Sequence, residues 1–231
     1  MTRQLIINFH GIGQPDDTID RGERSFWIDE NAMCQILDQI VVVKNRMPGQ
    51  DKESPEILIT FDDGNLSDLT VALPALVKRN LTATFFVCVG RMNDPRYLSR
   101  THIAELIACG MKIGNHGMFQ KNLMMLSDSE LEAEVETARM MLQDITGTPV
   151  TEFAIPYGAY NRRVMKWLKS RKLGCIYTSD RGFARSNALI KPRESVTAHM
   201  AHAMIPDVML MPGSLRLVIR RKISVTYKSW R

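Results

Sequence analysis

Short strand-like runs alternate with amphipathic segments along this chain of 231 residues, and this alternation limits the possible folds more than any other feature of the sequence. The strand-like runs are residues 5–9, 57–61, 83–89, 111–115, 152–155, 175–178 and 188–192. A helical pattern fits residues 26–43, 68–79, 100–108, 128–145 and 161–171. Strands and helices in alternation predict a parallel sheet, and about seven strands favour a barrel over the alternative, an open doubly wound sheet.

The length and the 45% hydrophobic content are sufficient for one sizeable core. We predict a single domain over residues 1–213 and a basic tail over residues 214–231, which holds six basic residues and no acid. No apolar run approaches the ~20 residues needed to span a bilayer, and residues 1–7 lack the pattern of a secretory signal. We therefore expect a soluble, cytoplasmic protein whose tail either lies on an anionic membrane surface or forms a solvated helix.

Cysteine content and charge exclude several function classes. The four cysteines have no Cys-x-x-Cys spacing, so we expect them to be reduced. The formal net charge of +5 is modest and lies largely in the tail. Because no nucleic-acid-binding module is recognisable, we expect no nucleic-acid partner.

Polar or glycine-rich residues follow six of the seven predicted strands. In order along the chain they are His10-Gly11, Asp62-Asp63-Gly64, His116-Gly117, Pro156-Tyr157-Gly158, Ser179-Asp180-Arg181-Gly182 and Arg193-Glu194. In a barrel and in an open parallel sheet alike, the carboxyl ends of the strands form the working edge. These residues therefore predict a functional site at one rim.

Two adjacent carboxylates, Asp62 and Asp63, end the second predicted strand. Because like charges repel, such a pair needs a stabilising partner, and a divalent metal ion is a natural one. A metal held by Asp63 and His116 could polarise a carbonyl and acidify water while Asp62 accepts a proton, which is the chemistry of amide or ester hydrolysis. The alternative is an Asp-Asp-Gly turn that caps the next helix.

Three segments carry a family resemblance: Thr-Phe-Asp-Asp-Gly at residues 60–64, Ile-Gly-Asn-His at 113–116 and Pro-Tyr-Gly at 156–158. In this order they resemble the first three motifs of the polysaccharide deacetylases, carbohydrate esterase family four. The resemblance extends from about residue 58 to residue 196. It implies a distorted (β/α)7 barrel and zinc-dependent removal of an acetyl group from an N-acetylated sugar.

The resemblance also implies roles for individual residues. Asp62 matches the family's catalytic base, while Asp63 and His116 match two of its metal ligands. Tyr157 matches the residue whose backbone N–H stabilises the oxyanion, and such donors are commonly worth a few kcal/mol of barrier. Its neighbours Pro156 and Gly158 are predicted to line the substrate site.

Two positions depart from the family pattern. Gln120 stands where the family has its second metal-binding histidine, and an amide oxygen is a weaker zinc ligand than an imidazole. Ala154 stands where the family has an arginine that orients the base. Arg193 is our candidate substitute for that arginine, the alternative being an ordinary surface residue.

The remaining candidates are histidines and one charged pair. The family's closing Leu-x-x-His motif fits residues 196–202 only loosely. We assign the proton donor to His199, which is nearer the last predicted strand, with His202 as the second choice; the alternative for each is a solvated helix or loop residue. His10 could line the pocket or replace the lost metal ligand, or it could be satisfied by backbone. Asp180 and Arg181 could hold sugar hydroxyls or pair with each other.

The function hypothesis is a metal-dependent N-deacetylase that acts on a cytoplasmic precursor of a cell-surface polysaccharide. One alternative is a catalytically weakened relative that binds a glycan or a partner enzyme through the same rim, for which Gln120 and Ala154 are the evidence. Another is an amidohydrolase that acts on a non-sugar amide. The choice depends on loops such as residues 14–24, because a fold does not determine a substrate.

Overall fold

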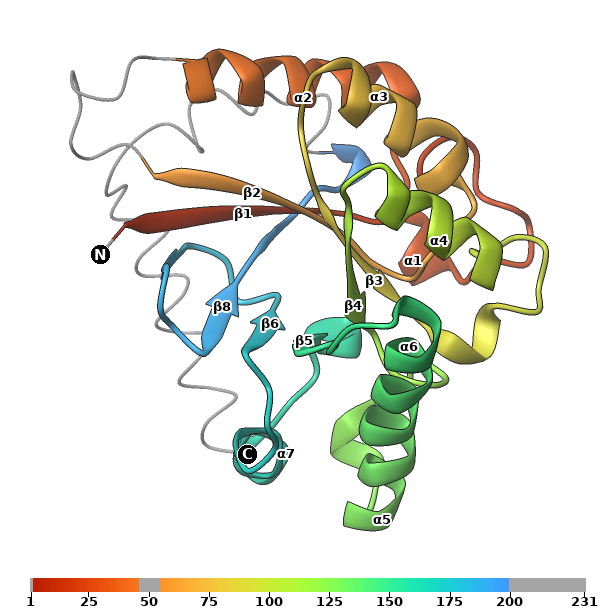
Figure 1. The fold of residues 1–231 in the computed structure, drawn as a ribbon, viewed down its shortest axis with the longest axis vertical. Helices are drawn as coiled ribbons and strands as arrows, with labels where there is room; N and C mark the ends of the chain where they lie inside the picture. Colours follow the sequence, from red (N-terminus) through yellow and green to blue (C-terminus); the bar gives the residue numbers. More distant parts are fainter. Residues whose placement is uncertain (1, 46–54, 200–231) are drawn as a thin grey trace.

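A largely parallel sheet curls into a nearly closed barrel in the computed structural model, which describes residues 2–45 and 55–199 (Figure 1). Its strands are β1 (Arg3–Phe9), β2 (Glu56–Phe61), β3 (Thr84–Val87), β4 (Lys112–Asn115), β5 (Glu152–Ala154), β6 (Cys175–Thr178), β7 (Phe183–Arg185), β8 (Ile190–Pro192) and β9 (Glu194–Ser195). The hydrogen-bonded order is β7-β1-β2-β3-β4-β5-β6-β8, and β9 also pairs with β1. The predicted α/β barrel is confirmed, and the open-sheet alternative is excluded.

The barrel closes only at the rim that carries the carboxyl ends of the strands. β8 pairs in parallel with β6, and Arg193 alone separates β8 from β9, which pairs in parallel with β1. At the opposite end β7 runs antiparallel to β1. A seam is therefore left between β7 and β8, while residues 190–195 link the two edges of the sheet at the rim.

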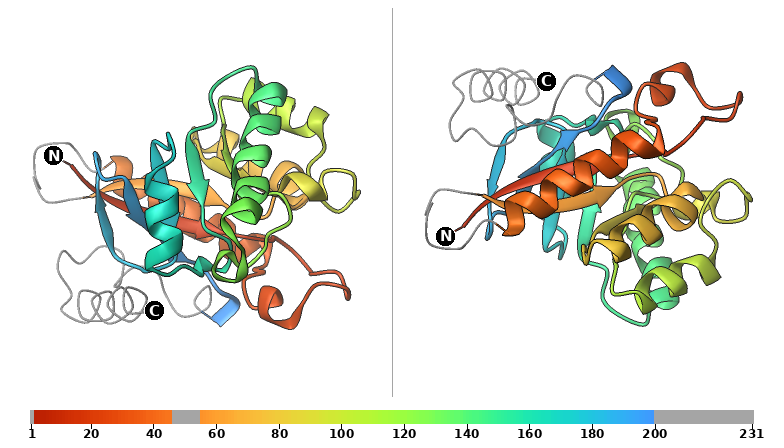
Figure 2. Two further views of the ribbon diagram at one scale, coloured as in Figure 1. Left: turned by 90° about the horizontal axis from the view of Figure 1, so that it is seen from below. Right: turned by 90° about the horizontal axis from the view of Figure 1, so that it is seen from above.

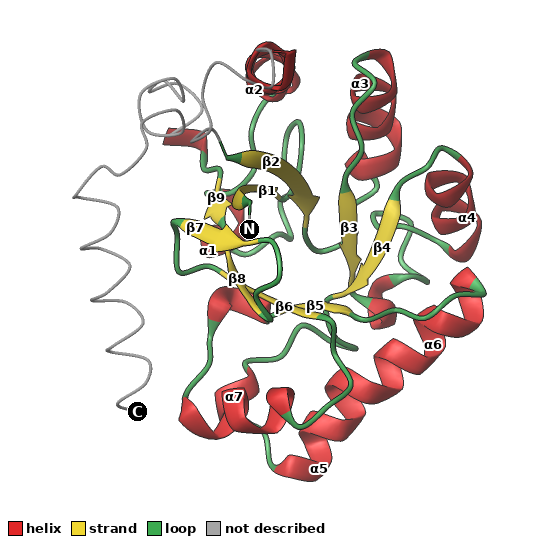
Figure 3. Cartoon of the chain, turned by 60° about the vertical axis from the view of Figure 1, so that its left-hand side comes forward, coloured by secondary structure: helices red, strands yellow, loops and turns green. Residues whose placement is uncertain are grey.

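Helices cover the outside of the barrel (Figure 3). They are α1 (Arg21–Arg24), α2 (Glu30–Asn45), α3 (Leu73–Lys78), α4 (Arg100–Ala108), α5 (Asp128–Leu131), α6 (Ala138–Thr146) and α7 (Arg162–Lys169). α2 lies along β1 and β2, as seen from above in Figure 2, and α7 lies on another side of the barrel. The predicted capping box is present, because Ser127 accepts a hydrogen bond from the Glu130 N–H and Glu130 accepts one from the Ser127 N–H.

Side chains along each strand alternate between the helices and the barrel interior. Ile7, Ile59 and Phe85 belong to the large core cluster under the helices. The smaller interior cluster contains Ile6, Phe86, Ala154, Tyr177 and Ala184. Asn8 and Thr60 follow the interior residues Ile6 and Leu58 by two positions. The same alternation therefore directs them into the interior, at the end where the strands finish.

The observed elements differ from the predicted ones where local caps or wide turns intervene. The predicted helix over residues 26–43 begins at Glu30, because the Asp29 side chain caps α2 by accepting a hydrogen bond from the Ala32 N–H at 2.8 Å. π-helical turns at Asp68–Ala72 and Glu132–Thr137 interrupt two other predicted helices. The sequence pattern did not predict β7 and β9, which are three and two residues long.

Two sequence-based predictions concern residues outside those that the structure describes. They are the basic tail at 214–231 and His202. Within residues 2–45 and 55–199, no helix is long and apolar enough to cross a membrane.

Candidate active site

A cavity of about 380 Å³ opens at the rim where the parallel strands end. Its lining includes residues that follow five different strands: His10, Asp62, Asp63, His116, Tyr157 and Arg181. The rim that the sequence predicted as the working edge therefore does carry a cavity.

Asp62 and Arg193 form a bidentate ion pair beneath this cavity. Arg193 Nη1 lies 2.7 Å from Asp62 Oδ1, and Nη2 lies 2.7 Å from Oδ2. Asn8 Nδ2 donates a third hydrogen bond to Oδ2 at 3.1 Å. Arg193 also donates to Asn8 Oδ1 at 2.9 Å and to Thr60 Oγ1 at 3.3 Å. These contacts fix the plane of the Asp62 carboxylate.

The guanidinium group of Arg193 is fully buried inside the barrel. Its carbon lies 5.4 Å from the centroid of the Phe86 ring and 5.7 Å from that of Tyr177, so both rings contribute cation–π attraction. Ala154 belongs to the same interior cluster as these two rings. The small side chain of Ala154 thus lies beside the space that Arg193, from the segment between β8 and β9, occupies.

Burial and charge act in opposite directions on Asp62. Burial raises the pKa of this carboxyl, but Arg193, together with His116 and His10, lowers it by more, so that the pKa falls far below the ordinary value. Asp62 is therefore ionised throughout the physiological pH range.

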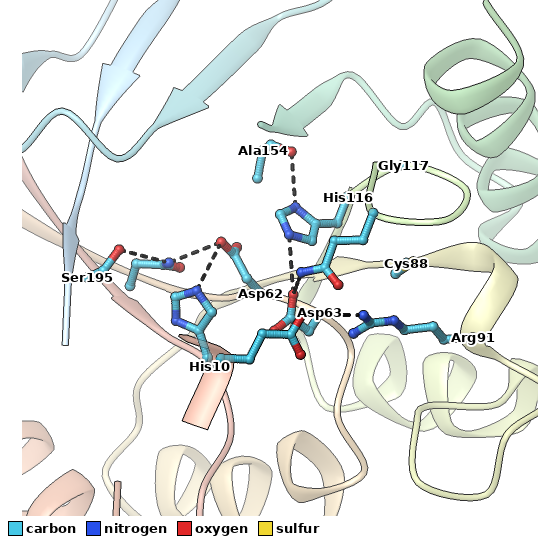
Figure 4. A network of polar contacts seen from close by, with 12 residues as sticks. His10, Asp62, Asp63, Cys88, Arg91, His116, Gly117, Ala154 and Ser195 are labelled. Atoms are coloured by element: carbon cyan, nitrogen blue, oxygen red, sulfur yellow. Dashed lines mark hydrogen bonds and ion pairs between the residues drawn. The ribbon is translucent and has the colours of Figure 1, made fainter. Parts of the chain in front are cut away.

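Asp63 reaches a different set of partners, although it adjoins Asp62 (Figure 4). Asp63 Oδ1 lies 3.3 Å from His116 Nε2 and accepts a hydrogen bond from Gln120 Nε2 at 2.6 Å. His116 Nδ1 lies 3.0 Å from the Ala154 carbonyl oxygen. Because a carbonyl only accepts, His116 donates through Nδ1 and, when neutral, presents the lone pair of Nε2 to Asp63.

A carboxylate oxygen and an imidazole lone pair at 3.3 Å both accept, so this contact needs a proton or a cation. Burial lowers the pKa of His116, but Asp62 and Asp63 raise it by more, which favours a proton in the absence of metal. A divalent cation would satisfy the same two atoms. Gln120 Oε1 is buried and has no hydrogen-bond partner among the described residues, and rotation of its amide would turn this oxygen toward Asp63 as a third ligand atom.

Asp63, His116 and Gln120 together suit a metal ion, although only the carboxylate and the imidazole are typical strong ligands. Among the residues described, no group of three His, Cys, Asp or Glu side chains could hold a metal. With the Gln120 amide included, the site offers one carboxylate, one imidazole and one amide oxygen, a mixed set that accommodates a divalent ion.

Backbone strain is concentrated at the cavity. Of the described residues other than glycine, five have positive φ angles, and Asp63, Gln120, Tyr157 and Arg181 of these five line the cavity. Left-handed backbone is costly for such residues unless the surroundings enforce it, and it is common at functional sites. The φ of 78° at Asp63 and 68° at Gly64 turns the chain so that the two aspartates face different partners.

Comparison with known proteins identifies the family. The model of the polysaccharide deacetylase family matches residues 49–176, more than half of the chain. The chain belongs to the polysaccharide deacetylase family. Members of this family are typically metal-dependent.

Individual relatives are distant from this polysaccharide deacetylase-type chain. It is 31% identical over 110 residues to a chitooligosaccharide deacetylase of Azorhizobium caulinodans, an alignment that covers 47% of this chain and 51% of the relative. The chain spans about half or less of the length of the first curated relatives it matches. The deacetylase PplD of Streptococcus pyogenes, solved in complex with acetate, shares the fold with a TM-score of 0.73 at 18% identity, over 91% of this chain and 99% of that one.

Besides Arg193, which lies beneath the cavity, three predicted site residues do not line it. His199 is exposed, so its position does not support its assignment as the proton donor. Pro156 is buried at the start of a 3₁₀ turn, whereas Tyr157 and Gly158 of that turn line the cavity. Asp180 is buried and accepts a hydrogen bond of 2.5 Å from Tyr160 Oη.

His10 reaches the cavity, but on the Asp62 side. Its Nε2 lies 3.9 Å from Asp62 Oδ2, its Nδ1 has no hydrogen-bond partner among the described residues, and its ring packs 4.7 Å from that of Phe26. Among the described residues, its ion-pair contact is with Asp62 rather than with Asp63. Burial is the largest influence on the pKa of His10 and lowers it, so the imidazole is neutral near pH 7.

The sequence analysis missed two parts of this site. Asn8 binds both Asp62 and Arg193, and its signal was a polar residue inside an otherwise apolar strand. Glu23 of α1 lines the cavity, and its Oε1 lies 3.6 Å from Arg91 Nη2. The only sequence signal for Glu23 was the general expectation that residues 14–24 shape the pocket.

Replacing Arg193 tests the energetic role of the ion pair. Arg193→Ala should lower the free energy of unfolding by about 3–5 kcal/mol at pH 7, because the Asp62 carboxylate would stay buried without its counter-charge. Arg193 holds the folded-state pKa below the unfolded value of about 4, so its stabilisation is present above that pH and is lost as the pH falls through the folded-state pKa.

Urea unfolding at pH 7 and pH 3 measures this effect, and the loss should be smaller at pH 3. Arg181→Ala, at a position whose side chain is 44% exposed, is the control and should change stability by less than about 0.5 kcal/mol. A wild-type unfolding free energy for Arg193→Ala at pH 7 would contradict the account.

Proposed function

We propose that this protein is a metal-dependent N-deacetylase that removes acetyl groups from an N-acetylated sugar in the synthesis of a cell-surface polysaccharide or oligosaccharide. The observation that carries the proposal is that the two adjacent aspartates contact different partners. Asp62 is oriented by Arg193, whereas Asp63 faces His116 Nε2 at a distance that calls for a cation. Family membership supports the same reaction class.

In this proposal Asp63, His116 and Gln120 hold the metal, most simply zinc. When bound, such an ion supplies Lewis acidity that polarises a carbonyl and acidifies water. Ala154 has a supporting role, because its carbonyl oxygen accepts the Nδ1 proton of His116 and so directs Nε2 to the ion.

Asp62 is the base in this mechanism. Its carboxylate is ionised, and the bonds from Arg193 and Asn8 hold it in one orientation without protonating it. A carboxyl group with so low a pKa retains a proton only briefly. It can therefore pass a proton from water to a neighbouring acceptor rather than store it.

His10 is the neighbouring acceptor and, in turn, the proton donor to the leaving amine. Neutral His10 lies with Nε2 3.9 Å from Asp62 Oδ2, close enough for transfer after a small movement or through one water. The protonated imidazole then faces the cavity, where it can protonate the departing nitrogen. His10 thereby takes the role that the sequence pattern assigned to His199.

Residues from the ends of β5 and β6 complete the cavity lining. Tyr157 is held in left-handed backbone at the rim, where its N–H is proposed to stabilise the oxyanion. Ser179, Gly158 and Arg181 from the neighbouring strand ends are proposed to contact sugar hydroxyls. The volume of about 380 Å³ is at the lower end of the range for small-ligand sites, so it suits a single sugar unit rather than a long buried chain.

One observation favours the second candidate, a catalytically weakened protein that binds a glycan. The amide nitrogen of Gln120, rather than an imidazole, lies against Asp63 at 2.6 Å. A site that keeps this arrangement would bind metal weakly and could retain sugar binding without turnover. Contact of residues 214–231 with a membrane and a cytoplasmic location remain separate proposals.

Paired aspartate variants test the proposed function. Asp63→Asn should remove bound metal, because an amide is a much weaker ligand, whereas Asp62→Asn should retain metal and lose turnover of acetylated chito-oligosaccharides by about 10²–10⁴-fold. Metal content of protein purified without chelators and the rate of acetate release are measured for both. If the wild-type protein retains no metal and releases no acetate, the glycan-binding alternative is favoured; full activity in both variants would contradict the role assignments.

A pair of histidine variants tests the proton donor. His10→Asn should lower kcat by about 10²–10⁴-fold with unchanged metal content, and the control His199→Asn should leave kcat unchanged. Because His10 must be neutral to accept a proton, wild-type kcat/KM should fall as the pH drops through the lowered pKa of His10. Loss of activity in His199→Asn but not in His10→Asn would reverse the assignment.

A further inference from the structure

The loop that carries Gln120 is bound by a buried carboxylate from a helix behind it. Glu134 is 2% exposed and lies in the π-helical turn Glu132–Thr137. Its Oε1 accepts hydrogen bonds from the Phe119 N–H at 3.0 Å and from the Lys121 N–H at 3.1 Å, and its Oε2 also accepts from Phe119 at 3.2 Å. The two anchored amides are those of the residues immediately before and after Gln120.

The π-helical turn adds two further contacts to the same segment. A π turn leaves carbonyl groups without their usual partners inside the helix. The Glu134 carbonyl oxygen accepts from the Met118 N–H at 2.8 Å, and the Val135 carbonyl oxygen accepts from Asn115 Nδ2 at 2.9 Å. The segment from the end of β4 to Lys121 is therefore held by backbone and side chain of one helical turn.

This anchoring matters because Gln120 has left-handed backbone, with a φ of 54°. Such a conformation is unfavourable for a residue with a side chain and persists only where neighbouring contacts enforce it. The conformation directs the amide of Gln120 to Asp63 Oδ1. The segment has little room to adjust, since a Cβ at Gly117 would lie 2.6 Å from Glu134 Oε1.

We propose that Glu134 is a positioning residue that holds Gln120 at the metal site by anchoring the backbone amides on both sides of it. The inference rests on the proposed function, because it assigns Gln120 to the metal. Glu134 does not line the cavity and acts only through the loop. In this chain, where the third ligand is a weak amide rather than an imidazole, the rigid loop compensates by presenting that amide in the right place.

Metal affinity and loop exchange test the proposal in the full-length protein. Glu134→Ala should weaken zinc binding, measured by competition with a chromophoric chelator, by about 10–100-fold, as is typical when a group that supports a metal ligand is lost. Glu134→Gln should lose less, because its amide oxygen can still accept from Phe119 and Lys121. The matched control is Glu136→Ala, two residues along the same turn, whose carboxylate binds Arg139 instead of the loop.

A double-mutant cycle separates positioning from general stability. In the Gln120→Ala background, Glu134→Ala should cause no further loss of zinc affinity, because the ligand on which it acts is absent. Zinc affinity that is unchanged in Glu134→Ala, or an undiminished effect in the Gln120→Ala background, would overturn the proposal. Melting temperatures of the metal-free variants identify any that do not fold, in which case Glu134→Gln decides.

Amide hydrogen exchange in metal-free protein distinguishes failure of this inference from failure of the proposed function. Exchange at Phe119 and Lys121 should accelerate by at least tenfold in Glu134→Ala and should not change in Glu136→Ala. If the wild-type protein binds no divalent metal, the proposed function fails, and the exchange result alone decides whether Glu134 anchors the loop. Unchanged exchange would overturn the anchoring role whatever the metal result.

Discussion

The buried ion pair between Asp62 and Arg193 connects the barrel, the base and the cavity. Asp62 follows β2 and Arg193 lies between β8 and β9, so the pair forms only when the two edges of the sheet have met at the rim. Two charges in an apolar interior are costly unless they match closely and their remaining hydrogen bonds are made. Both carboxylate oxygens receive a guanidinium N–H, and Asn8 and Thr60 provide further partners. The segment that closes the rim thus also delivers the charge that orients the base.

The adjacent aspartates can act differently because the backbone turns sharply between them. The left-handed conformation of Asp63 and Gly64 directs Asp62 toward Arg193 and His10, and Asp63 toward His116 and Gln120. One carboxylate keeps a strongly depressed pKa, while the other meets an imidazole across a gap that suits a cation. The strained backbone at the rim is held in place by two sets of contacts. The ion pair with Arg193 holds Asp62, and Glu134 holds the loop that carries Gln120.

The sequence predicted the barrel and the rim because both follow from local patterns. Strand and helix periodicity gave the order of elements, and strand ends are where parallel sheets carry their sites. The contact between Arg193 and Asp62 joins residues 131 positions apart, so the sequence could suggest it only from the missing arginine at Ala154. His199 was predicted as the proton donor from its place near the last strand, whereas the distance from His10 to Asp62 depends on how β1 pairs with β2. The role of Glu134 depends on a π-helical turn that has no periodic signal.

Moving the arginine between strands tests most directly the claim that a guanidinium group inside the barrel orients the base. Arg193→Ala should lower kcat for acetate release, and adding Ala154→Arg should restore part of it, because residue 154 adjoins the same Phe86 and Tyr177 rings. Ala154→Arg alone should reduce activity, since two guanidinium groups would compete for one space. Wild-type kcat and an unchanged pH profile in Arg193→Ala would contradict the account.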